Sequence, residues 1–334
     1  MNETNGNELA PGARNAVRTC LRVEGHERVA ILTDRETLEI AESIAREVRE
    51  IGAPLEMHVL EDYGERPMTV LPQALREVFE RSDVTVYAAQ PKTGELPSRI
   101  AMTAIVNRLG IRHAHMVSIS RRIMVEGMRA DYDEVDALST RVRDRAVRAT
   151  RIRATSRGGT DLEATFDPRI KWLKTSGLIS PEKWANLPGG EVLTAPARVD
   201  GVYVVDGVVG DYLCARYGDI ADTPLTVTIE KGRLADAKCD RADLLRDFFA
   251  YTSQEENSNR VGEFAMGTNV AVHSIIGNIL QDEKLPGLHL AFGHPYAEHT
   301  GADWSCRTHL DIVGRDFDVW FDTEQVMKNG KFLI

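Results

Sequence analysis

The first 120 residues alternate short apolar runs with stretches of helical periodicity, and this alternation restricts the fold more than any other feature of the chain. The apolar runs predict buried strands at Arg28–Thr33, Pro54–Leu60, Val84–Ala88 and Ala114–Ile119. The spacing between them predicts helices over 38–51, Leu71–Arg81 and Ser98–Leu109. Strands joined in turn by helices form a parallel sheet that is covered on both faces.

The helical periodicity stops at Arg157-Gly158-Gly159-Thr160, where a small polar stretch precedes a predicted strand at Asp161–Phe166. We place the domain boundary there. The predicted fold class is α/β, with an N-terminal domain of mostly parallel sheet over 1-157 and a C-terminal α+β domain over 158-334.

Charge and composition argue against several classes of partner. Asp and Glu (51) outnumber Lys and Arg (41), so no overall field attracts nucleic-acid phosphates or an anionic membrane surface. No apolar run approaches the ~20 residues of a membrane-spanning helix, and no signal-peptide pattern is present. Four widely spaced cysteines indicate a reducing compartment. We expect a cytoplasmic protein that binds neither nucleic acid nor membranes.

Histidines gather toward the C-terminus, where five of the nine lie between His273 and His309. In Thr308-His309-Leu310-Asp311-Ile312, the alternation of a strand places His309 and Asp311 on one face and the apolar residues on the other. An imidazole and a carboxylate that share a face form a natural metal chelate.

Three further candidates lie among apolar and small residues. His289 shares its strand face with Ala291 and Gly293, which leave room beside the imidazole, although this strand taken alone favours a core histidine bonded to the backbone. Glu263 is predicted to be buried, and a buried carboxylate must be paired or bind a metal. Glu191 starts a short apolar strand, where it either joins the same site or is exposed.

Four ordered motifs carry a resemblance to a known family. They are Asn186-Leu-Pro-Gly-Gly-Glu-Val-Leu-Thr-Ala-Pro196, Gly262-Glu-Phe-Ala-Met-Gly-Thr-Asn269, Asp282-Glu-Lys284 with Gly287-Leu-His-Leu-Ala-Phe-Gly293, and His309-Leu-Asp311. Together they resemble the thermophilic aminopeptidase T-like (leucyl aminopeptidase) metallopeptidases from about Gly158 onward. The resemblance implies that a pair of divalent metal ions is held by Glu191, Glu263, His289, His309 and Asp311, with Tyr296 nearby.

The resemblance also implies a hydrolase. Its expected reaction is that of an aminopeptidase, a protease that releases N-terminal residues from short peptides or cleaves a related small amide, through a metal-activated hydroxide. The three carboxylates against two divalent ions leave one positive charge for that hydroxide to neutralise. Two imidazoles and three carboxylates suit Zn, Co or Mn rather than Ca.

Catalytic roles are expected for Glu263 and Tyr296, the latter either as a ligand or as a donor to the oxyanion. The general base stays open between Glu283 and Glu298. The family resemblance also leads us to expect a homodimer.

A more distant resemblance to the 2,5-dihydroxypyridine 5,6-dioxygenases keeps a second function open. That family shares the His-x-Asp element and binds one Fe(II) through two histidines and a carboxylate. It places a histidine where Glu263 stands and lacks equivalents of Glu191 and His289, so this sequence favours hydrolysis. A binding protein with a degenerate site is less favoured, because every ligand type is present.

Two other features have both an ordinary and a functional interpretation. His113 and His115 share one face of a predicted strand, where they hold a metal or, as we favour, are satisfied core side chains. Seven arginines between Arg141 and Arg157 face an anionic substrate or a partner subunit or, as we favour, form a solvated helix face.

Overall fold

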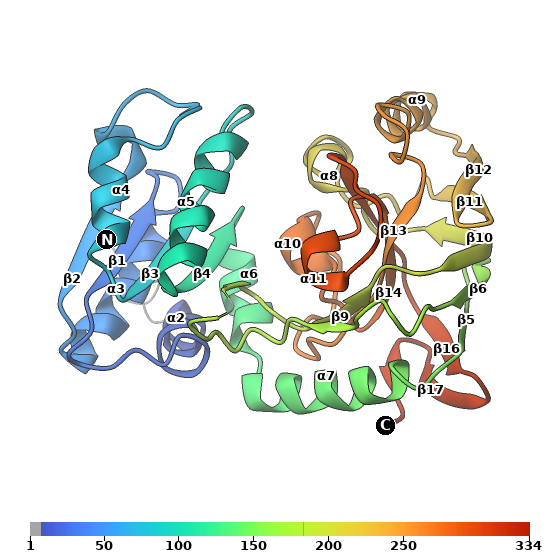
Figure 1. Cartoon of the computed structure of the whole chain (residues 1–334), viewed down its shortest axis with the longest axis horizontal. Helices are drawn as coiled ribbons and strands as arrows, with labels where there is room; N and C mark the ends of the chain where they lie inside the picture. The colour runs from blue at the N-terminus through green and yellow to red at the C-terminus, as the bar shows by residue number, and fades with distance from the viewer. Residues whose placement is uncertain (1–7, 183) are drawn as a thin grey trace. The chain divides into compact units, whose positions relative to one another are not determined.

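The computed structural model describes residues 8–182 and 184–334 and divides into two compact units (Figure 1). Unit 1 holds the chain up to Tyr132 together with Gly177–Gly189, and unit 2 holds Asp133–Ser176 and Gly190–Ile334. The expected boundary after residue 157 falls inside unit 2. There β5 (Arg151–Ser156) and β6 (Asp161–Thr165) pair antiparallel, so the Gly158-Gly159 stretch is a hairpin turn between two strands of one sheet.

Unit 1 contains the predicted parallel sheet, in the strand order β2-β1-β3-β4-β8. Its strands are β1 (Val29–Thr33), β2 (Leu55–Val59), β3 (Val84–Ala89), β4 (Arg112–Val117) and the short β8 (Ala185–Asn186). The first four confirm the predicted strands within two residues at their ends. β8 was not predicted, because two residues carry no readable periodicity.

Helices cover both faces of this sheet. The helical segments of unit 1 are α2 (Ala10–Arg14), η1 (Asn15–Cys20), α3 (Leu38–Ile51), η2 (Leu60–Asp62), α4 (Gln73–Glu80), α5 (Leu96–Leu109), α6 (Arg121–Val125) and η3 (Gly127–Arg129). Because β2 and β3 lie on opposite sides of β1, right-handed crossovers place α3 and α4 on opposite faces. Side chains of α4 and α5, among them Phe79 and Met102, pack together over one face.

The carboxyl ends of β1 and β3 form the point where the strand order reverses, a common ligand site in such sheets. Here the chain fills that point with its own buried Arg66. Its guanidinium lies 2.8 Å from Asp34 Oδ2 and 2.6 Å from Glu95 Oε2, and it donates to the Gln90 carbonyl. Asp34 also accepts the Gln90 amide at 2.7 Å. This network pairs the charges of Arg66, Asp34 and Glu95 with one another.

Unit 2 is built from two antiparallel sheets. Sheet B has the order β12-β11-β10-β6-β5-β16-β17-β18, and sheet C has the order β15-β14-β13-β9-β7. Beyond β5 and β6 the strands are β7 (Leu173–Lys174), β9 (Glu191–Thr194), β10 (Arg198–Val205), β11 (Leu225–Glu230), β12 (Arg233–Lys238), β13 (Val261–Gly267), β14 (Gly287–Gly293), β15 (His309–Val313), β16 (Phe317–Phe321), β17 (Glu324–Lys328) and β18 (Lys331–Phe332). The helices are α7 (Tyr132–Ala146), α8 (Asp211–Tyr217), α9 (Ala242–Thr252), α10 (Ile279–Asp282) and α11 (Ala297–Thr300).

Side chains from both sheets form one hydrophobic core in unit 2. Tyr203 on β10 and Phe317 on β16 stack within sheet B, and Phe264 and Phe292 come from sheet C. The Tyr203 hydroxyl donates to the Leu288 carbonyl at 2.7 Å, which ties the two sheets together and satisfies a buried polar group. Sheet C therefore has one face fixed in the core.

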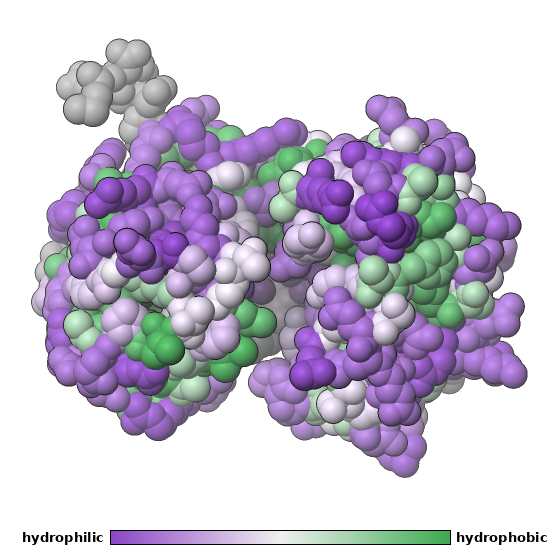
Figure 2. Space-filling view, turned by 90° about the horizontal axis from the view of Figure 1, so that it is seen from above, coloured by the Kyte–Doolittle hydropathy of each residue, from purple (hydrophilic) through white to green (hydrophobic). Residues whose placement is uncertain are grey.

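The surface is mostly hydrophilic with scattered hydrophobic patches, as Figure 2 shows for one face. Within the described ranges, no helix is both long enough and apolar enough to cross a membrane. All four cysteines are free thiols.

Candidate metal centre

Sheet C brings the five predicted ligands to one face. Paired residues of neighbouring strands share a face, and so do residues two apart on a strand. Glu263 pairs with Ala291, which pairs with Asp311, so these three form one row across β13, β14 and β15. His289 and His309 lie two residues from members of that row, on β14 and β15.

Glu191 joins the same face from β9, opposite Gly267 of β13. The alternate residues of these strands, such as Phe264, Leu290 and Ile312, point into the core and are fully buried. Strand alternation thus separates a polar face from an apolar one, and the apolar face holds the strands that position the polar side chains.

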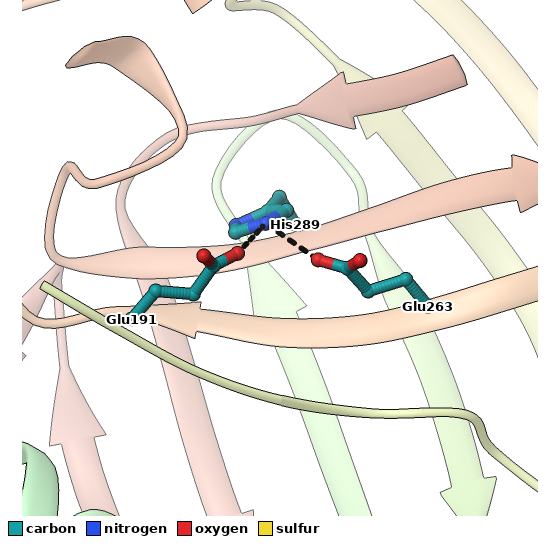
Figure 3. Close-up of side chains that lie close together, drawn as sticks. All are labelled: Glu191, Glu263 and His289. Atoms are coloured by element: carbon teal, nitrogen blue, oxygen red, sulfur yellow. Dashed lines mark hydrogen bonds and ion pairs between the residues drawn. The ribbon is translucent and has the colours of Figure 1, made fainter. Parts of the chain in front are cut away.

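Glu191, Glu263 and His289 meet closely, as Figure 3 shows. His289 Nε2 lies 2.9 Å from Glu191 Oε1 and 3.4 Å from Glu263 Oε1. Each of these three residues is at most 5% exposed. The structure therefore buries Glu263, as the sequence predicts. It also buries Glu191, whose burial the sequence left open.

Glu263 links this group to the His-x-Asp element. Its second carboxylate oxygen, Oε2, lies 3.8 Å from His309 Nε2, and His309 Nε2 lies 3.2 Å from Asp311 Oδ1. Asp311 Oδ1 is buried and accepts no hydrogen bond from the described residues. Glu263 is thus in contact with both imidazoles of the centre.

Tyr296 and His294 arrange the His309 ring. The Tyr296 ring packs edge-on against His309 with centroids 5.1 Å apart. The His294 carbonyl lies 3.3 Å from His309 Nδ1 and accepts a hydrogen bond from it, which leaves Nε2 to face the carboxylates. Tyr296 has a positive φ of 51°, a strained conformation for a bulky residue and one that occurs often at functional sites.

Lys284 is the site residue that sequence reasoning missed. It occurs in the Asp282-Glu-Lys284 motif, but a lysine beside two acids is typical of a solvated turn. Its ammonium lies instead 2.7 Å from Glu191 Oε2 and 2.6 Å from Glu283 Oε1, with a side chain only 3% exposed. Glu283, one of the two candidate bases, thereby joins the centre.

The charges of these groups shift one another's pKa values. Burial lowers the pKa of His289, but hydrogen bonds to Glu191 and Glu263 outweigh burial and raise that pKa to about 10. Burial also opposes the charge on Glu191, yet Lys284 and His289 hold the pKa of Glu191 well below its usual value. Burial raises the pKa of Glu283 to about 8, with Lys284 opposing the rise.

Two further pKa shifts concern the other end of the centre. Burial raises the pKa of the Tyr296 hydroxyl, and the neighbouring carboxylates, Glu263 first among them, raise it further, so this hydroxyl keeps its proton. Burial lowers the pKa of His309, but Asp311 outweighs burial and raises that pKa to about 10.

Small residues on this face serve two purposes. Ala291 separates Glu263 from Asp311 in the row, and its side chain is a single methyl group. At Gly293 the corresponding space is occupied by the backbone of Thr308, since a Cβ on residue 293 would clash with the Thr308 carbonyl. The φ of +104° at this position also favours glycine. The room predicted beside His289 is therefore partly filled by the chain itself.

Other candidates lie away from the centre. Glu298, the second candidate base, has a side chain 58% exposed and lies 3.9 Å from His299 Nε2. His113 and His115 are buried in unit 1, where they bond to each other at 3.1 Å and His113 bonds to Thr85 at 2.8 Å. They are satisfied core histidines, as favoured.

The arginine run divides between two elements. Its first members lie on α7, which ends at Ala146, and later ones lie on β5. Arg145, Arg151 and Arg153 form surface ion pairs with acids of neighbouring strands. The run is therefore a solvated, paired surface, only part of which is helical.

The donor set fits a divalent transition metal. One oxygen each of Glu191 and Glu263 and one nitrogen of His289 all lie within 4.8 Å of one another, and so do single ligand atoms of Glu283, His289 and Asp311. Imidazole and carboxylate donors are those preferred by Zn, Co and Mn. Asp311 Oδ1 is buried and faces His309 Nε2 at 3.2 Å, so the two form an imidazole–carboxylate pair that a cation could bridge.

Comparisons with known proteins agree on the fold. The dioxygenase structure "2,5-dihydroxypridine Dioxygenase from Pseudomonas putida KT2440" matches with a TM-score of 0.71 and 17% identity, covering 98% of this chain and 97% of that one. Wild-type AmpT from Thermus thermophilus matches with a TM-score of 0.70 and 16% identity, covering 98% and 99%. At such identities these likenesses show the fold alone.

Sequence comparison identifies the family. Aminopeptidase AmpS of Bacillus subtilis (strain 168) is 32% identical over 146 residues, which span 42% of this chain and 34% of AmpS. The match thus covers about a third of that relative's length. The family model described as thermophilic metalloprotease (M29) matches residues 122–313, more than half of the chain and the stretch that includes every predicted ligand. The chain therefore belongs to the thermophilic metalloprotease (M29) family.

Proposed function

We propose that this chain is a metal-dependent aminopeptidase that releases N-terminal residues from short peptides. The observation that carries the proposal is the contact of one buried carboxylate, Glu263, with both His289 and His309. This contact joins two chelating groups into one centre. The name of the relative AmpS and the M29 family support the peptidase activity.

The five predicted ligands would hold two divalent ions, Zn, Co or Mn. Such ions supply Lewis acidity, which polarises an amide carbonyl and lowers the pKa of water. The protonated Tyr296 hydroxyl can donate a hydrogen bond to the oxygen that becomes negative as the amide is attacked. Glu283 is a carboxylate of the same group with no ligand role in the resemblance, and we assign it the transfer of the proton from water to the leaving amine.

The fold does not decide between peptidase and dioxygenase, because both neighbours match equally well. The ligand set favours hydrolysis, since Glu191, Glu263 and His289 form a chelating group beyond the His309–Asp311 pair. The free thiols are consistent with our proposal of a cytoplasmic location. A homodimer is proposed from the resemblance.

The test compares two reactions on one preparation. The chain is stripped with chelator, reloaded with Zn, Co, Mn or Fe(II), and assayed with aminoacyl-nitroanilides and, separately, for oxygen uptake with 2,5-dihydroxypyridine. We expect hydrolysis that is lost with chelator and restored by Zn, Co or Mn. Oxygen uptake with Fe(II) and no hydrolysis with any metal would support the dioxygenase instead.

A further inference from the structure

Lys284 introduces a fixed positive charge into the carboxylate group of the candidate metal centre. Lysine is almost never fully buried unless it is paired. Here the ammonium is paired twice, at 2.7 Å with Glu191 Oε2 and at 2.6 Å with Glu283 Oε1. Two carboxyl groups at hydrogen-bond distance stabilise the ammonium in this buried position.

The two oxygens of Glu191 consequently have different partners. Oε1 lies 2.9 Å from His289 Nε2, on the side where a metal ion is expected, whereas Oε2 accepts a hydrogen bond from Lys284. A divalent ion that binds Glu191 must therefore share this carboxylate with an ammonium. At the other end of the centre, Asp311 Oδ1 faces the imidazole of His309 at 3.2 Å, not an ammonium.

We propose that Lys284 makes the centre electrostatically asymmetric, because its ammonium weakens divalent-ion binding on the Glu191 side relative to the His309–Asp311 side. The inference rests on the proposed function, since it concerns the same metal centre. Lys284 is a positioning residue in this account: it acts on the metal through Glu191 and takes no part in the reaction itself.

The expected effect is large because the charges are close. A unit charge and a divalent ion a few ångströms apart, at the effective dielectric constant of a protein site, change a binding constant by at least about tenfold. The effect on the His309–Asp311 side should be smaller, because the described ion pairs of Lys284 are with Glu191 and Glu283 and the Coulomb energy decreases with distance.

Removing the ammonium leaves Glu191 in place. The Thr175 hydroxyl donates to Glu191 Oε2 at 3.2 Å, and His289 holds Oε1. The backbone of Lys284 is held separately, since its N–H donates to the Gln281 carbonyl at 2.8 Å and its carbonyl accepts the Asn269 amide at 3.1 Å. Substitution of Lys284 by a neutral residue therefore tests the effect of the ammonium charge, because the Glu191 carboxylate and the backbone of residue 284 keep their other hydrogen bonds.

The experiment is titration calorimetry of the chelator-stripped chain with Mn(II) and with Zn(II), on wild type, Lys284→Met and Lys238→Met. Lys238 is 82% exposed and lies 3.9 Å from Asp236, so its substitution makes the same change in net charge far from the carboxylate group. For wild type we expect one tighter and one weaker ion. In Lys284→Met the weaker ion should bind at least about tenfold more tightly, while Lys238→Met should match wild type.

Unchanged or weaker binding in a folded Lys284→Met protein would overturn the inference. Folding is checked by circular dichroism, and Lys284→Gln, whose amide can still donate to Glu191, replaces the methionine variant if that variant does not fold. A wild type that binds neither metal overturns the metal centre and the inference together. A wild type that binds two ions with the same affinities as the variant overturns the inference alone.

Discussion

Glu263 is the side chain on which the candidate centre depends. It is 3% exposed, and its two oxygens face different imidazoles, His289 at 3.4 Å and His309 at 3.8 Å. Burial raises its pKa, and the neighbouring Glu191 and Asp311 carboxylates add to the rise, although His289 opposes it. A buried carboxylate in this situation gains stability when a cation binds beside it.

Substitution of Glu263 should therefore separate function from folding. Glu263→Gln keeps the shape of the side chain and removes its charge, and we expect a loss of at least about a hundredfold in peptidase kcat/KM together with weaker metal binding. Glu298→Gln, at the exposed carboxylate of the same type, should have no effect. Normal turnover by a folded Glu263→Gln enzyme would contradict the role assigned to Glu263.

The sequence motifs named the members of this cluster, but they did not show which side chains contact one another. The family resemblance named Glu191, Glu263, His289, His309 and Asp311 as a set. Their surroundings in the sequence alone indicated a buried Glu263 and a His309–Asp311 chelate, and left Glu191 and His289 open. Lys284 was not assigned a role, because its burial depends on how residues 282–286 turn before β14. That turn involves backbone bonds such as the one from the Asn269 amide to the Lys284 carbonyl, which no local pattern shows.

At the scale of elements, strand alternation divides sheet C into a chemical face and a structural face. Ala291 lies between Glu263 and Asp311 on the first, and Leu290 is fully buried on the second. Substitutions of adjacent residues on one strand should therefore have different effects. A change on the chemical face should affect metal binding, and a change on the structural face should affect stability.

We expect Ala291→Val to reduce metal binding and activity, because added methyl groups occupy the space between the two carboxylates. Leu290→Ala should instead lower the free energy of unfolding by about 2–5 kcal/mol and leave kcat of the folded protein unchanged. Urea unfolding and steady-state kinetics on both variants measure this division. Equal losses of activity in the two folded proteins would speak against it.

The reversal point of the parallel sheet is stabilised by Arg66. Arg66→Met leaves the carboxylates of Asp34 and Glu95 buried without their cation, and we expect a loss of about 3–5 kcal/mol in unfolding free energy. Arg81→Met removes a comparable contact, 2.6 Å from Glu56, where both side chains are about half exposed. Its loss should be much smaller, and similar unfolding free energies for the two variants would refute the account of Arg66.

Elements whose sequence shows a clear pattern were predicted well, among them β6 (Asp161–Thr165), which agrees with the predicted strand at Asp161–Phe166 to within one residue. β1 to β4 and the helices between them confirm the alternation of the first 120 residues. The sequence did not show where helix α7 ends, because the run of arginines that begins within the helix continues past Ala146 into β5. Short elements such as α10 and β8 span too few residues to show a period.

At the scale of the whole molecule, the chain passes from one unit to the other three times. Residues 177–189 return to unit 1, where β8 pairs with β4, before the chain enters unit 2 again at Gly190. The prediction placed one domain boundary, after residue 157. It therefore did not include the return of residues 177–189 to unit 1. It was drawn at a polar turn, and a hairpin turn has the same composition as a linker.

Buried histidines should make the stability of the protein depend on pH. Burial lowers the pKa of His113 to about 3, whereas an unfolded histidine has a pKa of about 6.5. The unfolded chain therefore binds a proton that the native chain excludes. The contribution of His113 to stability is complete above about pH 6.5 and decreases as the pH falls toward 3, by up to about 1.4 kcal/mol per pH unit.

Unfolding free energies measured between pH 5 and 7.5 test this dependence. His113→Asn should show a shallower slope than wild type over that range. An unchanged slope in His113→Asn would mean that His113 is not the group responsible.

The most direct test of the metal centre is anomalous X-ray diffraction from crystals of the full chain grown with Zn(II) or Mn(II). We predict anomalous peaks bounded by Glu191, Glu263, His289, His309 and Asp311. Well-diffracting crystals with no peak at these side chains, or with peaks only at other residues, would contradict the central claim that this face of sheet C binds metal.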